Sequence, residues 1–119
     1  METDEFEKLV IEAVESLPEF FKDKMDNVDL VVEDWPAAEF SRGRLLLGLY
    51  QGVPLPARGR GYSLVIPDKI TIFQGPIMLV SGGHKDAIKK VVADTVKHEI
   101  AHHFGISDAR LAEIEKNKR

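Results

Sequence analysis

The sequence of 119 residues contains no cysteine. This absence excludes disulfide bonds, and it also removes the thiolate ligands on which many structural zinc sites depend. A strong metal site in this chain must therefore be built from histidine and carboxylate side chains. The chain supplies 4 His and 20 Asp or Glu residues for that purpose.

The chain also lacks a large excess of either charge. Its 16 basic and 20 acidic residues give a formal net charge of -4, which argues against a surface for nucleic acid or for an anionic membrane. The acidic start "METDEFEKLV" does not resemble a signal peptide, and no stretch approaches the roughly 18 apolar residues of a membrane-spanning helix. We therefore expect a cytoplasmic protein that binds neither nucleic acid nor membrane.

The composition does supply enough apolar residues, 44% of the chain, for a hydrophobic core. A chain of this length is expected to form one core, so residues 1–119 are predicted to be a single domain. Apolar residues recur at helical spacing over residues 6–17 and again over residues 85–104. These two segments predict an N-terminal helix and a second long helix, the latter ending at Gly105.

Short β-branched or alternating runs between the two helices predict strands. These runs cover residues 28–34, 44–50 and 69–73. The second and third are separated by a long loop rich in Gly and Pro, with one further extended piece at 62–66. Residues 75–84 are compatible with either helix or strand, and a short helix is expected from about Asp108. The expected fold is α+β, with a small mixed sheet packed against both helices.

The segment "HEIAHHFGISD", residues 98–108, contains the pattern HExxHxxGxxD. Residues four apart lie on one face of an α-helix, so the imidazoles of His98 and His102 are able to converge on one metal ion. Glu99 lies on a slightly rotated face, where its carboxylate reaches a water on the metal as a general base without ligating the metal. This spacing predicts Zn²⁺ as cofactor, with His98 and His102 as ligands and Glu99 as catalytic base.

Asp108 is the candidate for the third ligand. An unbroken helix would carry it about 9 Å beyond His102 along the axis, too far for a shared ion. Gly105 lies between them, and glycine adopts the left-handed conformation that ends a helix without steric cost. We therefore predict that the chain turns at Gly105 and that Asp108 completes the metal site. The alternative, which does not exclude the first, is that Asp108 stabilises the start of the next helix.

Three other residues lie near the motif or could reach its site. The phenol of Tyr50, at the end of a predicted strand, is a candidate for hydrogen bonding to the oxyanion of a tetrahedral intermediate, and the alternative is an aromatic residue that covers the core. Asp94, one turn before His98, is a candidate for orienting its imidazole, although a solvated helix position is the commoner role. His103 points about 100° away from His102 and is left out of the site.

The segment "HEIAHHFGISD" resembles the HExxHxxGxxD signature of zincin metallopeptidases, and its glycine-bent third ligand is similar to the metzincin arrangement. Nearly the whole chain resembles the short bacterial "possible zinc metallopeptidase" family, the minimal zincins. The matching pieces are "LPEFF", "LLGLYQGVPL", "KITIFQGPI" and "HEIAHHFGISDARL". This resemblance implies a zincin-like α+β fold, metal ligation by His98, His102 and Asp108, and Glu99 as the base. Unlike metzincins, which carry a methionine turn after the third ligand, this chain has Met1, Met25 and Met78 before it.

The first functional hypothesis is a zinc-dependent metallopeptidase that hydrolyses peptide bonds with a zinc-bound water activated by Glu99. An extended peptide is expected to align along an exposed strand edge, at residues 69–73 or 44–50. Because 11 residues follow Asp108, the lower side of the cleft is expected to be small, which predicts completion by a homodimer or by a partner protein. The alternatives are a zinc-binding regulatory or interaction module without turnover, and metal-assisted hydrolysis of an amide that is not a peptide.

Overall fold

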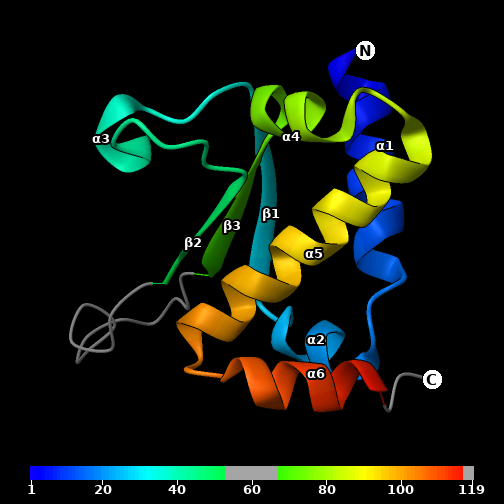
Figure 1. The fold of residues 1–119 in the computed structure, drawn as a ribbon, viewed down its shortest axis with the longest axis vertical. Helices are drawn as coiled ribbons and strands as arrows, with labels where there is room; N and C mark the ends of the chain where they lie inside the picture. Colours follow the sequence, from blue (N-terminus) through cyan, green and yellow to red (C-terminus); the bar gives the residue numbers. More distant parts are fainter. Residues whose placement is uncertain (53–66, 117–119) are drawn as a thin grey trace.

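The computed structural model describes residues 1–52 and 67–116 (Figure 1). The predicted helices at 6–17 and 85–104 are confirmed with small shifts at their ends, while the extended piece expected at 62–66 lies outside the described residues. The elements in chain order are α1 (Thr3–Glu15), α2 (Glu19–Lys24), β1 (Val28–Glu33), α3 (Ala38–Ser41), β2 (Gly48–Gln51), β3 (Asp68–Phe73), α4 (Gln74–Ser81), α5 (Lys85–His103) and α6 (Asp108–Lys116).

The strands form one mixed sheet in the order β1-β3-β2. The central strand β3 pairs parallel to β1, with Leu30 opposite Ile70, and antiparallel to β2, with Tyr50 opposite Ile70. The expectation that residues 69–73 offer a free edge is therefore wrong, because β3 has a neighbour on each side. Among the described strands β2 lies at an edge of the sheet, and α5 packs beside it.

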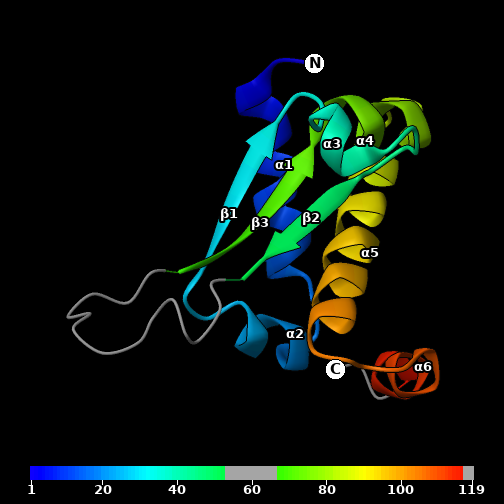
Figure 2. The same cartoon turned by 90° about the vertical axis from the view of Figure 1, so that its left-hand side faces the viewer.

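The hydrophobic core lies between the sheet and the helices. Figure 2 looks onto the strands, with α1 behind them and α5 along the side of β2. Helix α5 buries Ile88, Val92, Val96 and Ile100 completely, and this spacing of four residues makes one apolar stripe. Each such side chain contributes about 1.5–3 kcal/mol when it leaves water. Because that stripe faces inward, the rest of the helix circumference remains for polar residues.

Several elements differ from the sequence-based expectations. The strand expected at 44–50 begins only at Gly48, and the ambiguous segment 75–84 is largely helical in α4. The short helices α2 and α3 were not predicted, because four to six residues are too few to display a helical period.

Helix α5 comes very close to the backbone of β2 at Gly48, since a Cβ atom there would lie 2.7 Å from Cγ2 of Thr95. Glycine at this position therefore lets α5 approach the edge strand.

The turn between α5 and α6 follows the expectation for Gly105. This residue has a φ of 68°, and the amide of Ile106 donates to the carbonyl of Ala101 at 2.8 Å. That hydrogen bond is the one that closes a helix ending in a left-handed glycine. Helix α6 then begins at Asp108, as predicted for the short last helix, and it buries Leu111 and Ile114.

Among the described residues, no helix combines the length and the apolar character that crossing a membrane requires.

Candidate active site

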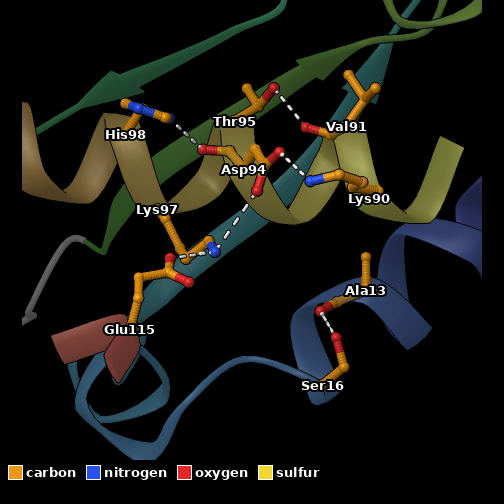
Figure 3. Close-up of polar contacts among 9 residues, drawn as sticks. All are labelled: Ala13, Ser16, Lys90, Val91, Asp94, Thr95, Lys97, His98 and Glu115. Atoms are coloured by element: carbon orange, nitrogen blue, oxygen red, sulfur yellow. Dashed lines mark hydrogen bonds and ion pairs between the residues drawn. The ribbon is translucent and has the colours of Figure 1, made fainter. Parts of the chain in front are cut away.

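His98 and His102 lie one turn apart on α5, and both side chains are exposed. Nδ1 of His98 is 2.7 Å from the carbonyl oxygen of Asp94. Figure 3 marks this contact with a dashed line. Because a carbonyl only accepts hydrogen bonds, Nδ1 carries the proton in the neutral ring, which leaves the lone pair of Nε2 for a metal ion. The imidazole is therefore held in the tautomer that a zinc ligand requires.

The carboxylate of Asp94 does not orient His98, although that was its candidate role. It faces Lys90 and Lys97 instead, with N–O distances of 3.2 Å and 3.5 Å. Figure 3 shows both ion pairs, and it shows the backbone carbonyl of the same residue meeting His98. The backbone supplies this orienting contact, so the identity of the side chain at position 94 gave no signal for it.

Glu99 is half-buried and joins α5 to the edge strand. Its Oε1 accepts a hydrogen bond from the backbone amide of Tyr50 at 2.9 Å. The amide of Tyr50 thus points away from β3 and toward the helix. One oxygen of the predicted general base is held in place by a residue 49 positions away in the sequence.

Tyr50 lies beside Glu99, but its side chain points to other partners. Its hydroxyl donates to Oδ2 of Asp68 at 2.6 Å, and its ring stacks on that of His103, with centroids 4.0 Å apart and an angle of 20°. The oxyanion role of Tyr50 stays a prediction. Sequence reasoning missed Asp68 and excluded His103, because only the register of β2 on β3 and the packing of α5 bring the three residues together.

Asp108 is the first residue of α6, and it is exposed. The hydroxyl of Ser107 accepts a hydrogen bond from the amide of Arg110 at 3.1 Å, so Ser107 caps this helix.

In the described ranges no three His, Asp or Glu side chains form a group that could hold a metal ion. The two histidines fit zinc by their shared helix face and by the tautomer of His98, whereas the third ligand stays a prediction.

Two adjoining pockets line the border between α5 and the edge strand. The larger, of about 410 Å³, has mainly apolar walls. Its lining residues are Leu46, Leu47, Gly48, Val80, Val91, Asp94, Thr95, His98 and Glu99. The smaller, of about 320 Å³, is lined by Arg44, Leu46, Leu49, Tyr50, Glu99, His102 and His103. Because both pockets include Glu99, the predicted base lies where they meet.

The chain also matches a known protein family. No curated protein matches the chain. The family model described as zincin-like metallopeptidase matches residues 25–118, which include every element from β1 to α6. The zincin-like α+β fold implied by the sequence resemblance is therefore confirmed. Because the match covers most of its length and includes the HExxH helix, the chain belongs to the zincin-like metallopeptidase family, a group of peptidases that generally use zinc.

Proposed function

We propose that the protein is a zinc-dependent peptidase. In this proposal His98, His102 and Asp108 hold the ion and Glu99 is the catalytic base. The observation that carries the proposal is the position of Glu99, whose carboxylate is anchored by the Tyr50 amide at the meeting point of two pockets. The neighbouring His98 presents Nε2 as its free ligand atom because Nδ1 is engaged by the Asp94 carbonyl.

Zinc, when bound, supplies a Lewis acid that polarises the scissile carbonyl and lowers the pKa of water. Glu99 takes the proton of the attacking water as the new C–O bond forms. It then returns that proton to the leaving nitrogen as the C–N bond breaks. A single carboxylate thus acts first as base and then as acid, and one peptide plus one water become two shorter chains.

The edge strand and the larger pocket indicate how a peptide would lie. In this proposal an extended substrate aligns with the side of β2 that faces away from β3, where main-chain groups not engaged by Glu99 provide affinity through hydrogen bonds. A side chain next to the scissile bond enters the pocket of about 410 Å³, whose walls include Leu46, Val80 and Val91. The substrate class that fits is therefore a peptide with a bulky apolar residue near the cleavage site. A second copy of the chain or a partner protein would complete the remaining side of the cleft.

The decisive test compares the wild type with Glu99→Gln. Both proteins are loaded with zinc, their metal content is measured, and both are incubated with a peptide library. We expect Glu99→Gln to retain zinc and to lose roughly 10²–10⁴-fold in turnover, the usual contribution of a general base. The control is Glu39→Gln, the same chemical change at an exposed position on α3, which should leave turnover unchanged.

Hydrolysis that persists in Glu99→Gln would contradict the proposed mechanism. A zinc-binding module without turnover gives a different result. In that case the wild type binds zinc and gains thermal stability from it, but neither protein cleaves any peptide of the library.

A further inference from the structure

Three residues outside the predicted zinc site surround the contact that holds Glu99. Asp68 accepts a hydrogen bond from the hydroxyl of Tyr50 at 2.6 Å, and the ring of His103 stacks on the tyrosine ring at 4.0 Å. We call Tyr50, Asp68 and His103 the tyrosine clasp. The backbone amide of the same tyrosine donates to Oε1 of Glu99 at 2.9 Å, so the clasp and the base meet in one residue.

The edge strand needs such a clasp because it is short and, among the described strands, pairs with β3 alone. Strand β2 has four residues, Gly48–Gln51, and its sole strand partner in the described sheet is β3. The amide of Tyr50 points to the unpaired side, so the pairing with β3 does not fix its distance from Glu99. The side chain of Tyr50 supplies that restraint by joining Asp68 at the start of β3 to His103 on α5.

Gly52 makes room for this arrangement. A Cβ atom on Gly52 would lie 2.8 Å from Cε1 of His103, closer than side chains normally approach. An alanine at this position would therefore displace the His103 ring from its place over Tyr50. This gives a way to disturb the clasp without altering any of its side chains.

We propose that Tyr50, Asp68 and His103 are positioning residues, which hold the Tyr50 amide where it fixes one oxygen of Glu99 and directs the other to the reacting water. The inference rests on the proposed role of Glu99 as base. A carboxylate fixed in one orientation is productive in a larger fraction of encounters than one that rotates freely. Tyr50 therefore acts through its backbone, whereas the oxyanion role predicted from the sequence would use its hydroxyl.

The test measures the amide of residue 50 by ¹H–¹⁵N NMR, in the metal-free and in the zinc-loaded protein. Glu99→Gln should move this amide upfield, because a neutral acceptor replaces a carboxylate. Tyr50→Phe removes the phenol–carboxylate hydrogen bond, and Asp68→Asn weakens it by replacing the charged acceptor with a neutral amide. Both should move the same amide part of the way. Their kcat should fall roughly three- to tenfold, in line with the loss of one hydrogen bond, while KM and zinc affinity stay within about twofold.

His103→Ala and Gly52→Ala test the stacked side of the clasp with the same amide signal. The matched control is His84→Ala, which removes an exposed histidine from the other end of α5 and should leave the residue-50 amide unchanged. If Tyr50→Phe does not fold, Asp68→Asn and Gly52→Ala decide the question.

The inference is overturned if the clasp variants lower the melting temperature but leave the residue-50 amide at its wild-type position. A fall in kcat for Tyr50→Phe without an amide shift would also overturn it and would favour the oxyanion role. Hydrolysis that persists in the Glu99→Gln variant would instead contradict the proposed function. The two failures are distinguishable, because the NMR measurements require no substrate.

Discussion

Lys97 on α5 forms an ion pair with Glu115 on α6 (Figure 3). This pair joins the helix that carries both histidines to the helix that begins with Asp108. The side chain of Lys97 is only 11% exposed, and its Nζ also lies 3.5 Å from Oδ1 of Asp94. A lysine whose side chain is largely buried thus connects the two helices.

Loss of this ion pair should weaken metal binding. We expect Glu115→Gln to lower zinc affinity, because α6 is then less firmly held where Asp108 is presented, and to lower the free energy of unfolding by about 1 kcal/mol. Isothermal titration with zinc and urea unfolding measure the two effects. The control is Glu113→Gln, which breaks an exposed pair with Arg110 on the same helix. Equal zinc affinity in both variants would contradict the prediction.

Glycine should be required at position 105 because of its left-handed backbone conformation, and not because a side chain would clash with its surroundings. Its φ is 68°, and an added Cβ would meet nothing within 4 Å, so Gly105→Ala should cost about 1–2 kcal/mol of unfolding free energy through backbone strain alone. Gly43 has a φ of 77° and equally open surroundings, so Gly43→Ala should cost a similar amount. Only Gly105→Ala should also weaken zinc binding, because only this turn leads to Asp108. A loss of zinc affinity in both variants would point to a general effect of instability.

Removal of zinc should lower thermal stability through His98. Zinc at one hundred times its dissociation constant should add about 2.7 kcal/mol to the unfolding free energy, and a chelator should remove this increment. His98→Ala should show no such increment, while its metal-free stability should not fall, since the side chain is exposed and alanine favours helices. Differential scanning calorimetry with and without zinc gives the comparison. A full zinc increment in His98→Ala would exclude this histidine as a ligand.

Substitutions at Val80 and Leu79 test whether the apolar pocket binds the substrate or whether any exposed apolar residue nearby has the same effect. They are neighbours on α4, with exposed fractions of 50% and 66%, but only Val80 is among the pocket-lining residues. Val80→Asp should reduce kcat/KM by roughly tenfold for peptides with a bulky apolar residue beside the cleaved bond. Leu79→Asp should have little effect on the same peptides. A matched set of peptides with Phe or Ala at that position provides the measurement, and equal losses in both variants would argue against the pocket.

The elements that were predicted correctly are those with a strong local pattern. The apolar stripe from Ile88 to Ile100 extends over more than three turns. Gly105 ends the helix through its own backbone preference, so α5 and its end could be predicted from neighbouring residues alone. Helices α2 and α3 are shorter than the patterns that identify a helix, and residues 44–47 have the composition of a strand without forming one. The amino-acid composition indicates which residues favour strand pairing, whereas the tertiary structure determines which of them pair with another strand.

The sequence by itself determined the chemistry of the motif: two imidazoles on one helix face, a carboxylate beside them, and a glycine that bends the chain toward Asp108. These follow from helix geometry and from the backbone freedom of glycine, which act over a few residues. The tertiary structure alone decided that β2 is the edge beside α5, that the Tyr50 amide holds Glu99, and that Asp68 and His103 gather around Tyr50. Such contacts join residues far apart in sequence, and strand register and helix packing set them.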